Sequence, residues 1–290
     1  MNILVLGGTR YFGVHLVNYL LQMGHDVTIA TRGNTKDIFE DRVKRIIVDR
    51  TDEKVMEKSF FGKEYDIVCD NIAYCSTDVR NILSNVKCKR YVMTSTMSVY
   101  EKLTMDLKEE EMDATKKKLI WCDRKDYGYD VIKQQAEAAL FQIYQNVDSA
   151  AVRFPFVIGK DDYTKRLYFY VEHVVRQKPM YVDNMDSKIA FIDSKEAGKF
   201  IAWLALQKGN GAWNACSEGV ISIGEIIAYV EEKAKKKALL TADGEAAPYN
   251  GAPSYELNTD KAKKSGYSFT KLNSFLYALL DHYIQEAENK

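Results

Sequence analysis

Tyr129 and Lys133 are the side chains whose types and spacing first suggest chemistry. The stretch reads Tyr-x-x-x-Lys, which on a helix puts a phenol and an ammonium on one face, one turn apart. A free tyrosine titrates at about 10, and a neighbouring positive charge favours its phenolate. We therefore expect Tyr129 to exchange a proton with a substrate alcohol. The hydroxyl of Thr96 is expected to hydrogen-bond the same substrate oxygen.

The spacing alone does not single out this pair, because Tyr229–Lys233 and Tyr267–Lys271 repeat it. Position along the chain separates them. Tyr129 lies after the fifth strand pattern and before the sixth, so its helix lines the carboxyl edge of a parallel sheet. Ligands bind at that edge in open α/β folds.

The amino-terminal stretch must position a ligand beside this pair. The apolar run Asn2–Leu6 stops at two glycines, and apolar residues then recur at helical spacing. Residues 25–30 follow as a second strand and complete a βαβ unit. We expect Gly7 to make the sharp turn, Gly8 to let the backbone approach a ligand, and Gly13 to let the helix pack on its strand.

This glycine turn predicts a dinucleotide site. Backbone amides at the start of the helix and the positive end of its dipole converge on one point, which suits a pyrophosphate. The residues of the turn that we expect to bind the cofactor are Gly7, Gly8, Thr9, Arg10, Tyr11, Phe12 and Gly13.

The end of the second strand bears on the choice between NAD and NADP. A carboxylate there accepts a hydrogen bond from the 2′-hydroxyl of NAD, whereas an arginine accommodates the 2′-phosphate of NADP. This strand ends Ala30-Thr31-Arg32, and Arg10 lies on the neighbouring turn. Because a guanidinium fits phosphate oxygens, we predict NADP, with NAD as the alternative. A solvated loop residue is the other explanation for either arginine.

Six strand patterns alternate with helix patterns in the first 155 residues. After the first two strands, the sequence predicts strands at 45–49, 65–70, 90–96 and 150–154, and helices at 78–86 and 129–143. The charged stretch 101–125 is typical of a solvated loop or surface helix. Since parallel neighbours need crossover helices, the alternation implies an α/β fold with a doubly wound, Rossmann-like parallel sheet.

The pattern is less regular beyond residue 155 and predicts a smaller lobe. Helix patterns are found at 165–178, 196–206, 223–235 and 271–287, and strand patterns at 188–192 and 211–215. We assign residues 1–155 to a dinucleotide-binding domain. Residues 156–290 are assigned mainly to a substrate-binding lobe that is partly interleaved with the main sheet and closes over the cofactor cleft.

Composition excludes several classes of partner. The 290 residues include 41 basic and 41 acidic side chains, so no net charge favours nucleic acid or an anionic membrane. No apolar run approaches the length of a membrane span, and no cluster has metal-ligand spacing. Five cysteines without a C-x-x-C pair fit reduced thiols. We therefore expect a cytoplasmic protein that takes a small-molecule substrate.

Motifs along nearly the whole chain, in the expected order, resemble the extended short-chain dehydrogenases/reductases, the NAD-dependent epimerase/dehydratase family. The first turn resembles G-x-x-G-x-x-G, with Arg10 in place of the middle glycine. Residues 94–100 resemble the strand-end motif S-S/T-x-x-V-Y. Residues 153–159 resemble the segment L-R-P-x-x-V-Y-G, and residues 211–217 resemble the strand G-x-Y-N-x-G-S.

The resemblance implies roles for individual residues. Thr96, Tyr129 and Lys133 match the catalytic residues of the family, and Lys133 would also hold the nicotinamide ribose. Asp49 matches an aspartate beside the adenine amino group, although an acid that caps the next helix would look the same. Beyond the glycine turn and Arg32, the expected cofactor-binding residues are Asp49, Arg50, Asn71, Ala73, Tyr129, Lys133, Phe154, Pro155 and Phe156, and the expected substrate-binding residues are Thr96, Met97 and Lys188.

Two departures from the family pattern limit the reaction. Family dehydratases place Asp-Glu after the catalytic threonine, whereas this chain has Met97-Ser98, so dehydration is disfavoured. The arginine that binds the substrate pyrophosphate in nucleotide-sugar enzymes is matched by Lys188. A lysine meets phosphate as a point charge without the bidentate fork, and a surface lysine is its alternative role.

We therefore predict an NADP-dependent oxidoreductase or epimerase that acts on a secondary alcohol or ketone by hydride transfer, with a nucleotide sugar as substrate. The alternative is a non-catalytic NAD(P)-binding regulator or an RNA-associated protein of the same fold. Chloroplast stem-loop-binding relatives are an example, because their first turn also reads G-G-T-R. Those relatives generally lack Tyr-x-x-x-Lys, which this chain keeps. The resemblance also implies a homodimer.

Overall fold

The computed structural model describes residues 1–289, and its main sheet in that range has seven parallel strands. In their order across the sheet these are β3 (Lys44–Ile47), β2 (Asp26–Thr31), β1 (Asn2–Leu6), β4 (Lys63–Asp70), β5 (Val86–Thr96), β6 (Asp148–Phe154) and β10 (Gly211–Asn214). The order reverses between β1 and β4, the switch point at which open α/β sheets bind ligands. The predicted α/β fold with a doubly wound, Rossmann-like sheet is confirmed.

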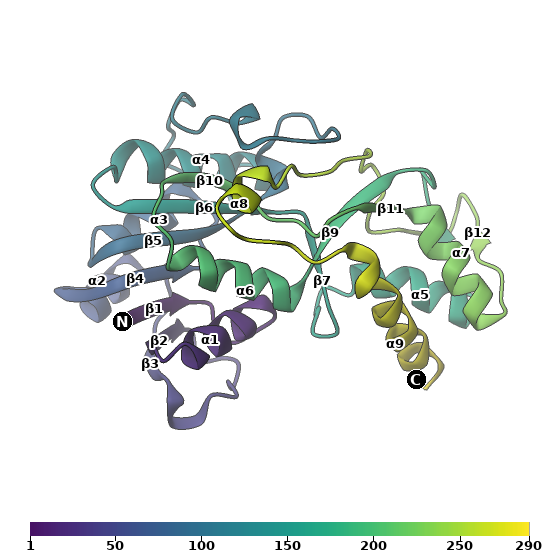
Figure 1. Cartoon of the computed structure of the whole chain (residues 1–290), viewed down its shortest axis with the longest axis horizontal. Coiled ribbons are helices and arrows are strands. Elements are labelled where there is room, and N and C mark those ends of the chain that lie inside the picture. The colour runs from purple at the N-terminus through teal and green to yellow at the C-terminus, as the bar shows by residue number, and fades with distance from the viewer. Residues whose placement is uncertain (290) are drawn as a thin grey trace.

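Helices cover both faces of the main sheet (Figure 1). One face carries α1 (Phe12–Gln22) and α6 (Ser194–Ala205), which pack on each other. The other face carries α2 (Glu53–Phe60), α3 (Ser76–Leu83) and α4 (Tyr129–Ile143). Both faces are therefore dry, which explains why the parallel strands have apolar sequences.

The central strand β1 shows how the sequence divides between these two faces. Ile3 and Val5 lie in the core beneath α1 and α6, whereas Leu4 and Leu6 lie in the core beneath α2, α3 and α4. Successive side chains of a strand point to opposite faces of the sheet. An uninterrupted apolar run is thus the pattern that a central strand requires.

A second core holds the C-terminal lobe together, on the right in Figure 1. Its helices are α5 (Arg166–Arg176), α7 (Ile223–Ala234) and α9 (Leu276–Glu288), and its larger sheet consists of β11 (Val220–Ser222), β9 (Lys188–Asp193) and β7 (Phe156–Ile158). A small sheet of β12 (Leu239–Leu240), β8 (Pro179–Tyr181) and β13 (Glu245–Ala246) adds to it, and α8 (Asp260–Lys264) lies beside β10.

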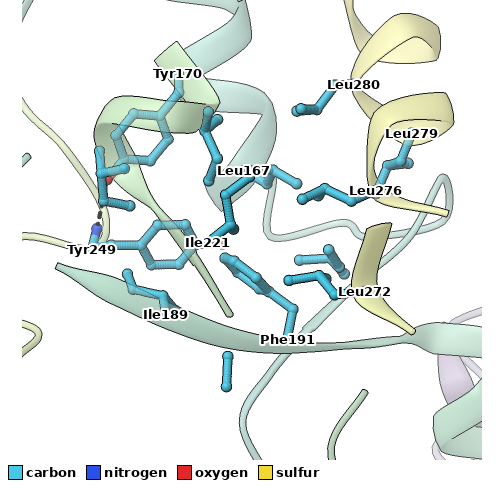
Figure 2. Packing of buried hydrophobic residues seen from close by; sticks show 14 of the residues in the cluster. Leu167, Tyr170, Ile189, Phe191, Ile221, Tyr249, Leu272, Leu276, Leu279 and Leu280 are labelled. Carbon is cyan, nitrogen blue, oxygen red and sulfur yellow. Dashed lines mark hydrogen bonds between the residues drawn. The ribbon is translucent and has the colours of Figure 1, made fainter. Parts of the chain in front are cut away.

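Figure 2 shows how this second core joins segments that are far apart in the sequence. Phe191 of β9, Leu167 of α5 and Leu276 of α9 are fully buried in one cluster. The backbone amide of Tyr249 donates a hydrogen bond to the Tyr170 hydroxyl, 3.2 Å away. The lobe is therefore closed by residues on both sides of the α6–β10 segment.

The predicted elements differ from the observed ones in several places. The helix expected at 78–86 is α3, which ends at Leu83 because β5 already begins at Val86. The last helix begins only at Leu276, after the 3-10 turn Leu272–Ser274. Helix α2 was not predicted, because it buries only two side chains and so has a weak apolar pattern. The short elements β7, β8, β11, β12, β13 and α8 were not predicted either.

The chain passes more than once between the two regions. Although α6 and β10 lie beyond residue 156, they pack with the main sheet, while β7 begins the lobe directly after β6. Whether residues 1–155 fold as a unit of their own stays a prediction. None of the helices described in residues 1–289 is long and apolar enough to cross a membrane.

The segment 101–128 is a long loop with only a short 3-10 turn, Glu109–Glu111, as regular structure among its described residues. The guanidinium of Arg153, which is fully buried, donates to the carbonyls of Glu109 and Met112, each 2.8 Å away. Farther along, the amide of Cys122 donates to Ser76 Oγ at 2.8 Å. The loop is thus held within its first half and again at Cys122, shortly before α4 begins.

Candidate active site

The glycine turn has the geometry that a dinucleotide-binding turn requires. Gly7 ends β1 with φ +81°, a left-handed conformation that side chains rarely adopt. At Gly13, an added Cβ would lie 2.4 Å from the Gly7 carbonyl oxygen. The start of α1 therefore rests directly on the end of β1, and only a glycine fits between them.

Gly8 serves packing of the core. An added Cβ there would lie 2.9 Å from Val17 Cγ2 and 3.2 Å from Ile29 Cγ2, both of which are buried side chains. The side-chain direction of Gly8 thus points away from the cleft and toward the layer between α1 and the sheet. Because Gly8 has no side chain, there is room for Val17 and Ile29. This role differs from the close approach to a ligand that was expected of Gly8.

A cleft of about 450 Å³ opens in front of this turn, at the carboxyl ends of β1 to β4. That volume lies within the range of small-molecule sites. Ten of the predicted cofactor residues line it: Gly7, Thr9, Arg10, Tyr11, Phe12, Gly13, Arg32, Asp49, Arg50 and Asn71. Eleven further residues line the cleft and were not predicted, among them Tyr74, Arg124 and Tyr163.

The floor of the cleft contains a buried ionic cluster. Arg50 donates to Asp70 Oδ1 at 2.5 Å and to the Asp78 carbonyl at 2.8 Å. The Tyr91 hydroxyl also donates to Asp70, at 2.7 Å. The Arg50 guanidinium is therefore already neutralised, and the residue shapes the floor of the cleft more than it supplies a free positive charge.

The charged side chains at the rim of the cleft are less fully paired than Arg50. Arg10 donates one hydrogen bond to Thr35 Oγ1, 3.0 Å away, and its guanidinium lies 5.8 Å from the ring centroid of Tyr163. Asp49 accepts from the amide and hydroxyl of Thr51, and these bonds, with Arg32 and Arg124 nearby, hold the pKa of Asp49 below its usual range. The cap of α2 is instead Asp52, so the capping role considered for Asp49 is wrong.

Asn71 ties together the strand ends that frame the cleft. Its Nδ2 donates to the Gly7 carbonyl at 3.1 Å, and its Oδ1 accepts from Thr94 Oγ1 at 3.2 Å. Tyr11, at the amino-terminal cap of α1, turns its hydroxyl inward to the Val157 carbonyl. These contacts hold the glycine turn, β5 and β7 in one frame.

Lys133 lies beneath the mouth of the site. Its Nζ donates to the carbonyls of Thr94 and Ala73, at 2.7 and 2.8 Å. The residue is only 3% exposed, and burial lowers the pKa of Lys133 to about 8, against the opposing charges of Asp70 and Glu137. Ala73 contributes through its backbone, since its own side chain is fully buried.

Tyr129 lies above Lys133 at the start of α4, next to Thr96. Burial of the hydroxyl raises the pKa of Tyr129 to about 12, and a hydrogen bond with Thr96 lowers it in part. The residue as a whole is 48% exposed, so the ring edge faces solvent while the hydroxyl is turned toward β5. Thr96 Oγ1 also accepts from the amide of Ser98 at 3.2 Å, which fixes its rotamer.

Tyr74 connects this trio with the dinucleotide cleft. Its ring meets that of Tyr129 edge to face, with centroids 6.1 Å apart, and Lys133 Nζ lies 5.0 Å from its centroid. Tyr74 itself lines the cleft. The structure therefore brings Thr96, Tyr129 and Lys133 to the end of the cleft, behind the lining residue Tyr74.

Other predicted residues lie outside the cleft lining. Phe154 is buried against Phe12, with ring centroids 5.8 Å apart, and Pro155 is buried beside it. Met97 is in the core of the lobe, which Phe156 also contacts. Lys188 is exposed at the start of β9, where its charge acts on Glu225 of α7.

The missed residues carry no local sequence signal. Arg124 lies in a charged run typical of a solvated loop, and Tyr74 is one of 19 tyrosines. Their place in the cleft depends on contacts with Asp78 and Tyr129, which are distant in sequence.

In the described part of the chain, no three metal-ligating side chains are grouped. A larger hollow of about 870 Å³ beside β10 shares no lining residue with the cleft.

Residues 3–83 match the sequence model of the NAD dependent epimerase/dehydratase family, so the predicted resemblance is confirmed. A curated relative, the chloroplast stem-loop binding protein of 41 kDa b from Arabidopsis thaliana, is 30% identical over 114 residues. The match covers 34% of this chain and 30% of that protein, so this chain spans about a third of the relative's length.

Solved structures of nucleotide-sugar epimerases resemble this fold over the whole chain. UDP-glucose 4-epimerase of Thermotoga maritima with UDP-glucose has a TM-score of 0.76 at 17% identity, over 99% of this chain and 100% of that one. The Thermus thermophilus enzyme in complex with NAD has a TM-score of 0.74 at 18% identity, over 98% and 99%. UDP-glucuronic acid 4-epimerase of Bacillus cereus, with its UDP-sugar and NAD, also has 0.74 at 18%, over 99% of each chain. At these identities the likeness shows a common fold.

Proposed function

We propose that this chain, whose residues 3–83 match the NAD dependent epimerase/dehydratase family, is an NADP-dependent epimerase or reductase of nucleotide sugars. One observation carries the proposal. Tyr129, Lys133 and Thr96 are grouped at the carboxyl edge of the sheet, and a single aromatic ring, Tyr74, lies between them and the dinucleotide cleft.

The cleft fits a dinucleotide by its donors and by its shape. The left-handed Gly7 and the tight contact at Gly13 bring the amino-terminal end of α1 to the cleft, where the positive end of the helix dipole would attract a pyrophosphate. Lys133 would hold the nicotinamide ribose. When bound, the nicotinamide would supply the redox chemistry, by accepting a hydride from the substrate carbon and returning it.

Tyr129 would move the proton that accompanies this step. With a pKa of about 12, its phenol is almost wholly protonated at neutral pH. A further positive charge must therefore lower the pKa of Tyr129 before it can act as a base, and an oxidised nicotinamide carries that charge. The Thr96 hydroxyl would hydrogen-bond the same substrate oxygen and hold it beside the phenol. Lys133 is held by the carbonyls of Ala73 and Thr94, which fix its ammonium over the ring of Tyr74.

The preference for NADP over NAD rests on the rim of the cleft. Thr31, at the end of β2, offers no carboxylate, while Arg10 and Arg32 both line the cleft and have guanidinium donors left for a phosphate. Titration of the purified protein with both cofactors tests this preference. NADP should bind more tightly than NAD in the wild type, and equally in Arg32→Ala; tighter binding of NAD by the wild type would refute it.

The proposed substrate class follows from the resemblance together with the trio. Epimerisation and net reduction use the same proton donor and acceptor, so Tyr129, Lys133 and Thr96 would serve either reaction. Met97 and Ser98 occupy the positions of the acid pair of dehydratases, which leaves elimination without its catalysts.

The same resemblance leads us to propose a homodimer through α3 and α4. We also propose that the protein is cytoplasmic, because all five cysteines are free.

A turnover assay tests the function. Purified protein is incubated with NADP or NADPH and a panel of UDP-sugars and UDP-keto-sugars, and products are separated by chromatography. We expect turnover in the wild type and its loss in Tyr129→Phe, with the cofactor affinity of that variant unchanged. Activity that survives Tyr129→Phe would contradict the assigned role of the phenol.

A second candidate function is RNA binding, which the similarity to the Arabidopsis protein favours. The balance of 41 basic and 41 acidic residues argues against it. Filter binding of a stem-loop RNA at moderate salt separates the two candidates. RNA retention by a protein that turns over no UDP-sugar would favour this second function over the first.

A further inference from the structure

Arg124 occupies a place in the cleft that none of the matched motifs accounts for. It comes from the loop 101–128, yet it lines the cleft together with Asp49, Thr51 and Ile72. The backbone just before Arg124 is held in place, because the Cys122 amide donates to Ser76 Oγ at 2.8 Å and the Thr77 amide donates to the Cys122 carbonyl at 3.3 Å. The guanidinium is therefore presented by an anchored backbone.

The guanidinium of Arg124 is fixed by contacts with three neighbours. Its Nε donates to Asp78 Oδ2 at 3.0 Å, and one terminal nitrogen donates to the Ile72 carbonyl at 2.9 Å. Its Cζ lies over the ring of Tyr74, 4.7 Å from the centroid. The side chain is still 34% exposed and lines the cleft, so part of it remains accessible to a ligand there.

The part of the cleft next to Arg124 is where the base of a bound dinucleotide would lie. The pyrophosphate would rest at the glycine turn and the adenosine ribose at the end of β2. The base then extends beyond the ribose, toward the residues Val48–Thr51 at the end of β3. Asp49 lines the cleft there together with Arg32 and Arg124, whose positive charges help to lower its pKa.

We propose that Arg124 forms one wall of an adenine slot and stacks its guanidinium on the base. A planar, weakly hydrated guanidinium stacks well on aromatic rings, and here its orientation is fixed in advance by Asp78 and Ile72. The last residues of the loop would then contact the base through Arg124 and lead directly into α4 at Tyr129. This inference rests on the proposed dinucleotide binding.

The experiment compares cofactor affinity, measured by calorimetry, in Arg124→Met, Arg124→Lys and a matched control, Lys125→Met. Lys125 is exposed on the same loop, so its removal takes away one neighbouring charge without touching the cleft. Stacking on a base contributes roughly 1 to 3 kcal/mol, so Arg124→Met should weaken both NADP and NAD by about tenfold. Arg124→Lys should bind both cofactors almost as weakly as Arg124→Met, because lysine keeps the positive charge but lacks the planar guanidinium. Lys125→Met should bind as the wild type does.

Two further measurements separate stacking from other roles. The loss in Arg124→Met should persist at high salt, which screens a contact between charges. Nicotinamide mononucleotide, which lacks the adenosine half, should bind Arg124→Met and the wild type equally, although each weakly.

Several outcomes would overturn the inference. Recovery of wild-type affinity in Arg124→Lys, or a loss confined to NADP, would assign Arg124 to a phosphate. An equal loss for nicotinamide mononucleotide, or a lowered melting temperature in the absence of nucleotide, would assign it to loop structure. If the wild type bound neither dinucleotide, the proposed function itself would fail, and that result is distinct from the others.

Discussion

Gly13→Ala offers a sharp test of how the glycine turn builds the cofactor site. Gly13 is the second residue of α1, a helical position at which alanine is normally favoured over glycine by about 1 kcal/mol. Propensity alone therefore predicts a more stable protein. The packing predicts the opposite, because the new Cβ would lie 2.4 Å from the Gly7 carbonyl oxygen.

The expected size of the effect follows from that distance. Ordinary contact begins at 3.4 Å, so the start of α1 must retreat from β1 by about 1 Å. Overpacking of this kind costs roughly 1 to 3 kcal/mol, which cancels or exceeds the gain in helix propensity. The amides that face the pyrophosphate move with the helix. Losing one or two hydrogen bonds to a charged group should weaken cofactor binding by roughly tenfold to a hundredfold.

Gly24→Ala at the other end of the same helix is the matched control. Gly24 has φ +77° but no atom lies within 4 Å of an added Cβ, so this change adds strain of about 1 kcal/mol without a clash. Urea unfolding and calorimetric titration with NADP are measured on both variants. Gly24→Ala should lose stability and keep its affinity, whereas Gly13→Ala should lose affinity. A Gly13→Ala protein that is more stable than the wild type and binds NADP equally well would refute the reasoning.

Two further predictions concern buried charges. Glu137 is fully buried and accepts from Arg153 at 2.6 Å, so Glu137→Gln should lower the free energy of unfolding by about 3 to 5 kcal/mol because it strands the guanidinium. Urea unfolding checks this against Glu64→Gln, whose partner Lys87 is solvent-exposed and which should leave stability almost unchanged; equal effects of the two variants would contradict the prediction. Lys133, with its pKa lowered to about 8, is charged in the folded protein only below that pH, whereas an unfolded lysine keeps its proton up to about 10.4. Since the unfolded state binds more protons between these values, the wild type should gain up to about 3 kcal/mol of stability from pH 8 to pH 10, relative to Lys133→Met. Parallel pH profiles of the two proteins would show that Lys133 is not desolvated.

The sheet and its glycine turn could be predicted because their signals are local. The apolar run Asn2–Leu6 and the helical repeat after it need no knowledge of the rest of the chain. The strand at 211–215 was also visible in the sequence. Its place as the seventh strand, beside β6, was not, because strand pairing is decided between segments far apart in the chain.

The function of single glycines and arginines in the cleft could be predicted only in part. Gly8 and Gly13 look alike in the sequence, and only the packing shows that one faces Val17 and the other the Gly7 carbonyl. Arg50 was expected to contact the cofactor. Its guanidinium is instead paired with Asp70, 20 residues away in the sequence, as part of a buried cluster.

The contribution of the loop 101–128 could not be predicted at all. Its charges are typical of a solvated segment, but Arg153 of β6 holds it at Glu109 and Met112, and Ser76 of α3 holds it at Cys122. Arg124 is carried into the cleft by those two anchors. The sequence pattern shows that Arg124 is charged, but it does not show the distant carbonyl and hydroxyl groups that fix its position.

Under the proposed mechanism, Tyr129 becomes a base only when an oxidised nicotinamide lies beside it. The most direct measurement is the pKa of this phenol, followed by NMR of ¹³C-labelled tyrosine and assigned with Tyr129→Phe. Without cofactor, Tyr129 should titrate at about 12, and with saturating NADP its pKa should fall by at least two units. A pKa that does not change when NADP binds would place the phenol away from the nicotinamide and contradict the account.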